Sequence, residues 1–138
     1  MITRLPLWLL MFCVAGMTGC SKDDTPPLGE VTGKVTLDGA PLEGVIVVFK
    51  PEVGRPATAT TTAEGTYELE FAYQVPGCKV GKNKVYMEWP LGSTKAKALD
   101  PKYTSASELS ADVKEGDNTF NFDLVSPGGK TKKVVIPD

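Results

Sequence analysis

The chain has 138 residues, 41% of them hydrophobic, which suits one globular domain with a short appendage. Its 15 basic and 17 acidic residues give a formal net charge of -2 and are scattered along the chain, so no basic patch indicates binding to nucleic acid. The chain has no histidine, which excludes Ser-His-Asp and Cys-His catalytic sites and removes the commonest neutral metal ligand.

Residues 1–19 are predicted to be a signal peptide. Arg4 precedes a run of thirteen mostly apolar residues, Leu5 to Met17. A helix that crosses a bilayer needs about 20 such residues, so this run is too short to span one. A basic start, a short apolar run and small residues at its end are typical of a secretory signal. A buried core helix is the alternative, but no polar face accompanies the run.

Met17-Thr18-Gly19-Cys20 resembles the lipobox of bacterial lipoproteins, with Met17 where an aliphatic residue is usual. The resemblance implies cleavage before Cys20, acylation of its sulfur and new amino group, and attachment to membrane lipid. The alternative is an ordinary secretory peptide cleaved near Gly16, which would leave Cys20 as a free or disulfide-forming thiol. Because Ser21 rather than aspartate follows the cysteine, the resemblance favours the outer over the inner membrane of the cell envelope.

Residues 20–29 are predicted to be a flexible tether, because this stretch is polar, contains prolines and lacks any apolar period. The remaining cysteines do not indicate a disulfide framework. Cys13 would leave with the signal peptide and Cys20 would be acylated, so Cys78 would be the single thiol of the mature domain.

From residue 30 onward the dominant hydrophobic period is two, which predicts strands. In the clearest example, Tyr67, Leu69 and Phe71 alternate with Glu68 and Glu70. Glycine and proline turns divide the pattern, and helix signals are almost absent. We expect seven strands, over residues 31–37, 45–50, 57–62, 66–71, 82–89, 109–113 and 118–125, the last two forming a hairpin around 114–117.

Seven short strands without helices predict two antiparallel sheets packed face to face. The predicted fold is therefore an all-β, seven-stranded antiparallel β-sandwich over residues 30–125, followed by a tail at residues 126–138. About twenty inward apolar side chains would stabilise this domain without disulfides.

Two segments of the body resemble a known domain family. VTGKVTLDGAPLEGVIVVFKP, residues 31–51, is similar to the start "G-x-V-x-x-[DN]-G-x-P-L-x-G-[AV]" of carboxypeptidase regulatory-like domains. Residues 62–67 resemble that family's glycine-containing hairpin, with Ala63 in place of the usual aspartate. The resemblance implies a transthyretin-like (prealbumin-like) sandwich of Greek-key type. Residues 80–85 resemble a further strand of the family, with Asn83 at a position that is usually aromatic.

The end of the body carries a third resemblance. Residues 100–125, DPKYTSASELSADVKEGDNTFNFDLV, are similar to the ending of many small bacterial lipoproteins with one such domain. Asp112, Glu115, Asp117 and Asp123 lie in this segment. Their spacing does not follow the twelve-residue calcium loop, so we interpret them as solvated turn residues rather than a metal site.

Residues 90–108 are predicted to be a long loop, and loops of this length are either functional or mobile. Trp89 and Tyr103 are the candidate ligand contacts, because an aromatic ring there could stack on a sugar or a peptide. The alternative is that both rings cover the edge of the sandwich.

The first functional hypothesis is a lipid-anchored, non-enzymatic cell-envelope protein that acts as a structural or protein-interaction module. The alternative is a carbohydrate- or peptide-binding domain displayed at the membrane. The expected partners are membrane lipid, through acylated Cys20, and an envelope protein or glycan, with no nucleic acid. A transthyretin-like hydroxyisourate hydrolase is disfavoured, since that group uses histidines and this chain has none. We expect no catalytic residue, no cofactor and no metal ligand.

Overall fold

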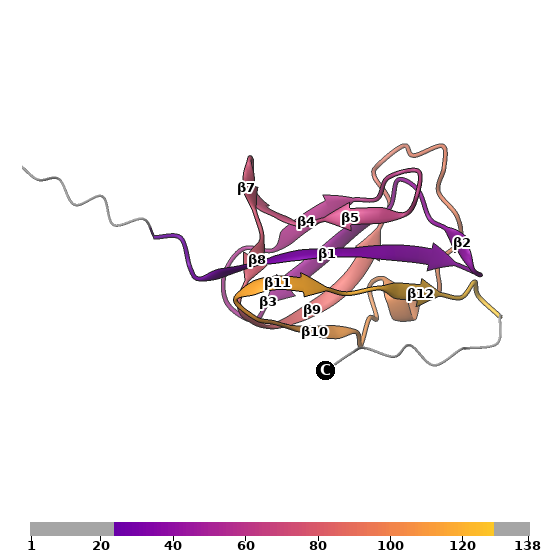
Figure 1. Cartoon of the computed structure of the whole chain (residues 1–138). Coiled ribbons are helices and arrows are strands. Elements are labelled where there is room, and N and C mark those ends of the chain that lie inside the picture. Colours follow the sequence, from indigo (N-terminus) through magenta and orange to yellow (C-terminus); the bar gives the residue numbers. More distant parts are fainter. Residues whose placement is uncertain (1–23, 129–138) are drawn as a thin grey trace, which may run out of the picture.

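The computed structural model describes residues 24–128, which fold into two β-sheets packed face to face (Figure 1). The helix present in this part of the chain is a three-residue 3-10 turn, η1 (Pro101–Tyr103). The prediction of an all-β sandwich is therefore confirmed. The predicted signal peptide, Cys20 and the tail from residue 129 lie outside the described residues.

Each sheet contains six strand segments, so the described residues hold more segments than the seven strands predicted. The first sheet contains β1 (Leu28–Leu37), β2 (Ala40–Pro41), β5 (Thr66–Glu68), β8 (Cys78–Lys79), β11 (Gly116–Thr119) and β12 (Phe122–Leu124). The second has the order β10-β9-β3-β4-β6-β7, with β3 (Ile46–Pro51), β4 (Ala57–Thr60), β6 (Glu70–Ala72), β7 (Val75–Pro76), β9 (Gly81–Glu88) and β10 (Ser110–Val113).

Strand β1 is the centre of the first sheet, and every other strand of that sheet pairs with it. It runs antiparallel to β2, β5 and β8 but parallel to β11 and β12. The prediction of antiparallel pairing is therefore wrong between β1 and the last two strands. Parallel neighbours need a long connection, and here nearly the whole domain lies between them.

The predicted hairpin of residues 109–113 and 118–125 does not form. Strand β10 pairs with β9 in the second sheet, whereas β11 pairs with β1 in the first. The turn between them therefore carries the chain from one sheet to the other. Asn118 holds this crossing: Lys114 N donates to its Oδ1 at 2.9 Å, and its Nδ2 donates to Glu30 O at 3.0 Å.

The predicted strand at residues 66–71 also divides between the two sheets. Glu68 pairs with Thr32 of β1, and Glu70 pairs with Thr58 of β4. Leu69 lies between them, is fully buried, and donates its backbone N–H to Val31 O at 2.9 Å. The alternation of inward and outward side chains continues across the division, which is why the sequence pattern shows a single strand.

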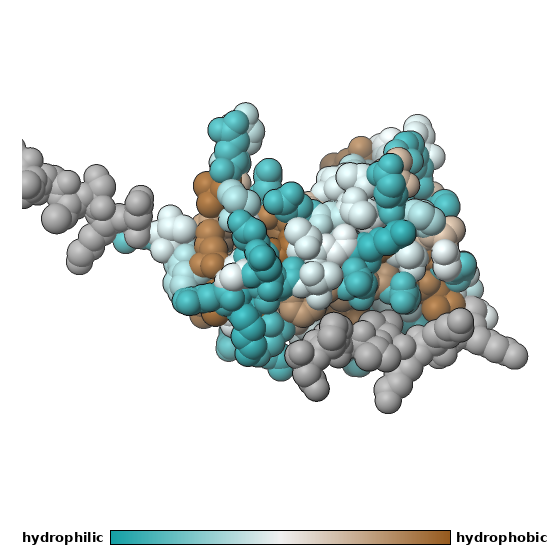
Figure 2. Space-filling model, viewed as in Figure 1, coloured by the Kyte–Doolittle hydropathy of each residue, from teal (hydrophilic) through white to brown (hydrophobic). Residues whose placement is uncertain are grey.

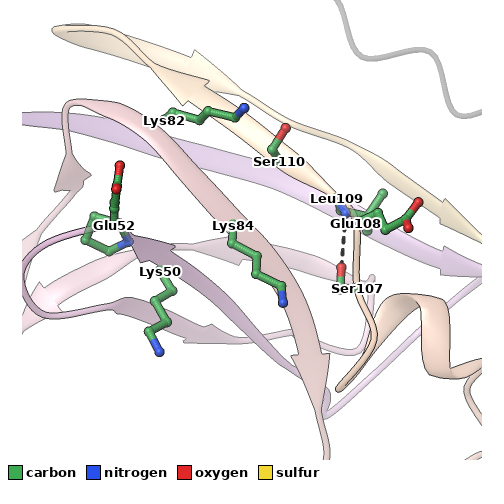
Figure 3. Close-up of a pocket in the computed structure, with 9 residues that line it drawn as sticks. Lys50, Glu52, Lys82, Lys84, Ser107, Glu108, Leu109 and Ser110 are labelled. Carbon is green, nitrogen blue, oxygen red and sulfur yellow. Dashed lines mark hydrogen bonds between the residues drawn. The ribbon is translucent and has the colours of Figure 1, made fainter.

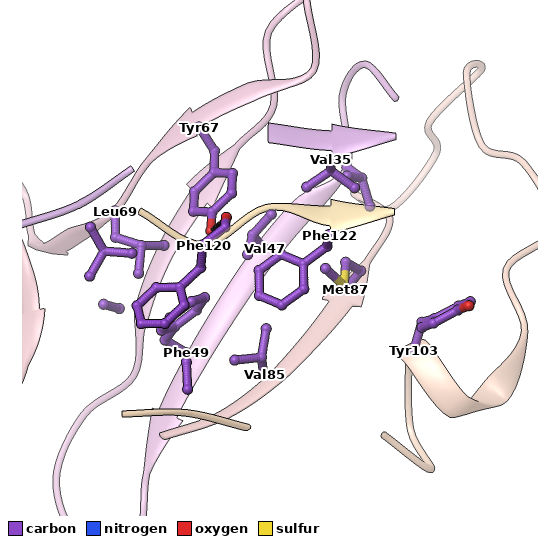
Figure 4. Packing of buried hydrophobic residues seen from close by; sticks show 14 of the residues in the cluster. Val35, Val47, Phe49, Tyr67, Leu69, Val85, Met87, Tyr103, Phe120 and Phe122 are labelled. Carbon is purple, nitrogen blue, oxygen red and sulfur yellow. Dashed lines mark hydrogen bonds between the residues drawn. The ribbon is translucent and has the colours of Figure 1, made fainter. Parts of the chain in front are cut away.

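The core lies between the sheets, and four of its aromatic rings pack against one another (Figure 4). The ring of Phe49 lies 5.7 Å from that of Phe120 and 6.2 Å from that of Phe122, measured between centroids. Tyr67 stacks on Phe122, and its hydroxyl donates to Phe120 O at 2.6 Å, which satisfies its polar atom inside the core. The fully buried aliphatic side chains around these rings include Val31, Val35, Val47, Leu69, Val85, Met87 and Leu124.

The turn after β1 has the backbone that its sequence predicts. Asp38 and Gly39 have φ values of 52° and 84°, the pair of positive angles found in tight hairpin turns that favour Asp-Gly. The following segment is fixed by buried Thr61, whose hydroxyl donates to Leu42 O at 2.6 Å and accepts from Val45 N at 3.1 Å.

The two ends of the sandwich differ in what they carry. We call the end where β1 begins the tether end, because residues 24–27 lead into it (Figure 1). It contains the β3–β4 connection (residues 52–56), the β6–β7 turn (residues 73–74) and the β10–β11 turn (residues 114–115). The opposite end carries the loop of residues 90–108 and is called the loop end.

Candidate functional site

A depression of about 590 Å³ opens on the outer face of the second sheet (Figure 3). It spans strands β3, β9 and β10 and the segment just before β10. Its lining residues are Lys50, Pro51, Glu52, Lys82, Lys84, Ser107, Glu108, Leu109 and Ser110. We call Lys50, Lys82 and Lys84 the lysine face.

The strand register places two residues of the lysine face side by side. Lys50 of β3 lies directly opposite Lys84 of β9, and Ser110 of β10 lies opposite Lys84 on its other side. Residues paired in this way share one face of the sheet, with Cβ atoms about 5 Å apart. Two like charges are therefore neighbours on an exposed surface.

Within residues 24–128 the three lysines of the lysine face form no ion pair, although Asp112 of β10 lies opposite Lys82. The ion pairs in this part of the chain form at Lys95, Lys102 and Lys114 instead. Glu52 and Glu108 line the same depression, so its charge is mixed. An anionic group placed between Lys50 and Lys84 would relieve their repulsion, which makes the depression a candidate site for carboxylates or other anions.

Ser107 forms the buried floor of the depression and is 5% exposed. Its hydroxyl donates to Val85 O at 2.5 Å and accepts from Leu109 N at 3.2 Å. The hydroxyl proton is therefore held by a backbone carbonyl rather than by a base. Ser107 fixes the end of the long loop to β9, and a nucleophilic role has no geometric support.

Cys78 lies in β8 and is fully buried. Burial raises the pKa of its thiol to about 12, so the thiol stays protonated at neutral pH. The thiolate is the nucleophilic form of cysteine, and the Cys78 side chain therefore acts as a small apolar core residue.

Tyr103, predicted as a ligand contact, is a core residue. Its side chain is 4% exposed, and its hydroxyl accepts from Val125 N at 3.3 Å. The ring has no open face on which a sugar or peptide could stack, so the structure corrects this prediction. Turn η1 places the ring there, since Asp100 accepts from Lys102 N at 3.1 Å and Pro101 starts the turn.

Trp89 is half-buried and packs against the core. Its indole Nε1 donates to Lys97 O at 2.9 Å, which ties the long loop to the end of β9. A further contact holds the loop where Lys95 pairs with Glu43. These contacts fasten the long loop to the end of the sandwich, and they use the indole N–H of Trp89 within the chain.

The acidic residues near the β10–β11 turn do not form a cluster. Asp112 accepts from Lys114 Nζ at 2.7 Å, and Asp123 accepts from the Thr36 hydroxyl at 2.7 Å on the other sheet. Within residues 24–128 no three acidic or cysteine side chains are close enough to hold a metal ion.

Asn83 lies inside the sandwich and is fully buried. Its Nδ2 donates to Lys79 O at 3.0 Å and to Gly81 O at 2.9 Å, so the amide holds the bend between β8 and β9. Among the described residues its Oδ1 has no hydrogen-bond partner. The amide group is thus held inside the sandwich by its bonds to the backbone.

The lysine face could not be located from the sequence. Lys82 and Lys84 are outward positions of one strand, but nothing local shows that Lys50 lies beside them. The sequence contains one weak signal for this site. Lys82 and Lys84 alternate in β9 and therefore lie on the same face of that strand, whichever strand pairs with it. The proposed acylation site, Cys20, lies outside the described residues.

Comparisons with known proteins leave the family of this chain open. No family model matches the chain, and no curated protein matches it. Among solved structures it is similar to a DUF3823 family protein from Parabacteroides merdae ATCC 43184, with a TM-score of 0.48 and 14% sequence identity. The match covers 72% of this chain and 47% of that protein, so the chain spans about half of its length.

Residues 24–128 contain no helix that is long and apolar enough to cross a bilayer.

Proposed function

We propose that this chain is a lipid-anchored, non-enzymatic β-sandwich protein of the cell envelope that acts as an interaction module. The observation that carries the proposal is the lipobox-like Met17–Cys20, which follows a short apolar run and precedes strand β1 by eight residues. Acyl chains on Cys20 would hold the sandwich at a membrane, and two or more chains are needed for a stable anchor. The outer membrane is the preferred location because Ser21 follows the cysteine.

We further infer that the sandwich is a carboxypeptidase regulatory-like domain with transthyretin-like Greek-key topology. The positions of the sequence motif support this inference because each has a structural task. Gly33 faces the backbone of Phe120, Asp38 and Gly39 form the tight turn, and Gly44 has a φ of 80°. Leu42 of the same motif is buried in the core.

The proposal of a non-enzymatic role draws on the state of two potential nucleophiles, Cys78 and Ser107. The Cys78 thiol is buried with its pKa raised, and the Ser107 hydroxyl is held by the backbone. Neither side chain has an activating base within its hydrogen-bond partners.

The second candidate function is the binding of a carboxylate-bearing peptide or glycan at the lysine face. The observation that favours it is the direct opposition of Lys50 and Lys84 in an open depression. Binding there would be electrostatic and therefore weakened by salt. This location replaces the predicted contact at Trp89 and Tyr103.

The anchor is tested by replacing the acylated cysteine. Cys20→Ser is expected to move the protein from the detergent phase to the aqueous phase in phase partitioning, because serine cannot form the thioether. Intact-mass measurement should show diglyceride and acyl groups on the native chain and none on the variant. Cys78→Ala is the matched control, since it removes the other thiol of the mature domain and should stay in the detergent phase. A Cys20→Ser chain that stayed there as well would refute the proposal.

The lysine face is tested by Lys84→Glu, which should change binding and stability in opposite directions. The substitution places a carboxylate opposite Lys50, so the free energy of unfolding is expected to rise by about 0.2–1 kcal/mol. Binding of poly-L-glutamate and of alginate, measured by calorimetry at low salt, should fall at least tenfold.

Lys34→Glu is the control for this prediction. Lys34 is an exposed strand lysine that lies opposite Thr66 on the first sheet. Equal losses of binding in both variants would indicate non-specific charge attraction and contradict a site at the lysine face.

A further inference from the structure

Large hydrophobic side chains are exposed at three positions in the described part of the chain. Val53 is 73% exposed, Tyr73 is 87% exposed and Leu91 is 104% exposed. Val53 and Tyr73 lie in two separate connections at the tether end, and Leu91 lies at the loop end. Single exposed hydrophobic residues are ordinary on protein surfaces. Val53 and Tyr73 indicate a binding surface only if they lie close together and if the surface around them is also apolar.

Val53 is fixed relative to the start of β1. Lys79 Nζ donates to Val53 O at 2.7 Å. Lys79 itself lies opposite Leu28 where β8 pairs with β1. The tip of the β3–β4 connection is thus linked through one side chain to the point where the chain enters the sandwich.

Tyr73 projects from the tight β6–β7 turn. Ala72 and Val75 pair across this turn, and Gln74 at its tip has a φ of 58°. Arg55, from the connection that carries Val53, lies over the Phe71 ring at 5.5 Å from its centroid. The two exposed tips are therefore neighbouring parts of one end of the molecule, and β7 projects there in Figure 1.

The surface between the tips is partly apolar. Figure 2 shows hydrophobic surface (brown) at this end, below the projecting β7 turn. The strand segments that meet at this end, with the residue that follows β8, contain four half-buried apolar residues, Leu28, Phe71, Val75 and Val80. The charges close by are mixed, because Arg55 and Lys79 are accompanied by Glu52 and Glu115. This end suits a neutral lipid headgroup layer rather than a strongly anionic one.

We propose that the tether end lies on the lipid surface, with the side chains of Val53 and Tyr73 inserted among the headgroups. This inference rests on the proposed anchor at Cys20. Leu28 is the eighth residue after Cys20, so the start of β1 lies within about 28 Å of the acylated residue. At that range insertion is an intramolecular event, and a weak contact suffices to orient the domain. Tyrosine is suited to this position, since its ring is apolar and its hydroxyl remains in water.

The orientation has a consequence for the rest of the domain. Strand β9 runs eight residues from Gly81 at the tether end to Glu88, a distance of about 23 Å. Trp89, Leu91 and the long loop would therefore point away from the bilayer. They would be displayed to the surrounding envelope.

Quenching of tryptophan fluorescence by brominated lipid tests the orientation. The native mature chain contains one tryptophan, Trp89, because Trp8 lies in the predicted signal peptide. The acylated native protein and its Tyr73→Trp variant are reconstituted into phosphatidylcholine vesicles with and without brominated acyl chains. We expect the emission of Trp89 to fall by less than a tenth, and the emission added by Tyr73→Trp to fall by at least half.

Leu91→Trp is the matched control, since it adds a tryptophan at an equally exposed site of the loop end. Its added emission should not be quenched. Val53→Glu combined with Tyr73→Trp should restore most of the lost emission, because a carboxylate at Val53 opposes insertion. Flotation of the vesicles reports the anchor separately. If the protein fails to float with the vesicles, the proposed anchor is wrong; if it floats and Tyr73→Trp is unquenched, or is quenched no more than Leu91→Trp, the docked orientation is wrong.

Discussion

Phe49→Ala is expected to lower the free energy of unfolding by about 3–5 kcal/mol, as large aromatic truncations in protein cores do. Phe49 is fully buried in β3, and its ring lies within 6.5 Å of the rings of Tyr67, Phe120 and Phe122. Those partners come from the opposite sheet, so the truncation removes contacts that hold the two sheets together. Urea unfolding of the unacylated chain, followed by fluorescence and circular dichroism, measures the change.

Tyr73→Ala is the control, because Tyr73 is an aromatic residue that is 87% exposed. Its removal should change stability by no more than about 0.5 kcal/mol. A loss of under about 1 kcal/mol for Phe49→Ala would mean that the two sheets do not pack through this ring, and would contradict the fold.

The inward and outward positions of the strands could be predicted from the sequence. Tyr67 and Leu69 are buried and Glu68 and Glu70 are exposed, as the alternation indicated. The pattern depends only on which face of a strand meets the core. Each sheet of a sandwich has one such face, so the pattern does not say to which sheet a strand belongs. For this reason Leu69 marks a change of sheet that the sequence did not reveal.

The pairing of distant strands also could not be predicted from the sequence. The parallel register of β1 with β11, and the opposition of Lys50 and Lys84, are set by contacts between segments far apart in the chain. The position of Tyr103 had a local signal that was missed. Asp100-Pro101 is a typical start of a turn, and this turn directs Tyr103 into the core.

Gly33 of the β1 motif is required by a close contact between two backbone segments. A Cβ on Gly33 would lie 1.8 Å from Phe120 O and 2.8 Å from Tyr67 Cε1. The ladder between β1 and the last strand is interrupted at Phe120 and Asn121, and Lys34 N donates to Asn121 Oδ1 at 2.9 Å there. The last strand therefore follows β1 closely because residue 33 has no side chain.

Gly33→Ala is expected to lower the free energy of unfolding by about 3 kcal/mol, at the upper end of the range for overpacked interiors. The atom in conflict with the added methyl group is a backbone oxygen, so no change of side-chain rotamer relieves the contact. The strand must move away, and Phe120 and Phe122 must move with it out of the core. Urea unfolding should show the loss, and near-ultraviolet circular dichroism should show weaker aromatic packing.

Gly39→Ala separates this steric effect from the backbone preference of glycine. Gly39 has a φ of 84°, and a Cβ added there would meet no atom within 4 Å. Its replacement therefore costs only the strain of a left-handed backbone, about 1–2 kcal/mol. The near-ultraviolet spectrum should then stay native. If Gly33→Ala were the milder of the two substitutions, it would contradict the close approach of β1 to the last strand. It would then also contradict the parallel pairing of β1 with β11 and β12.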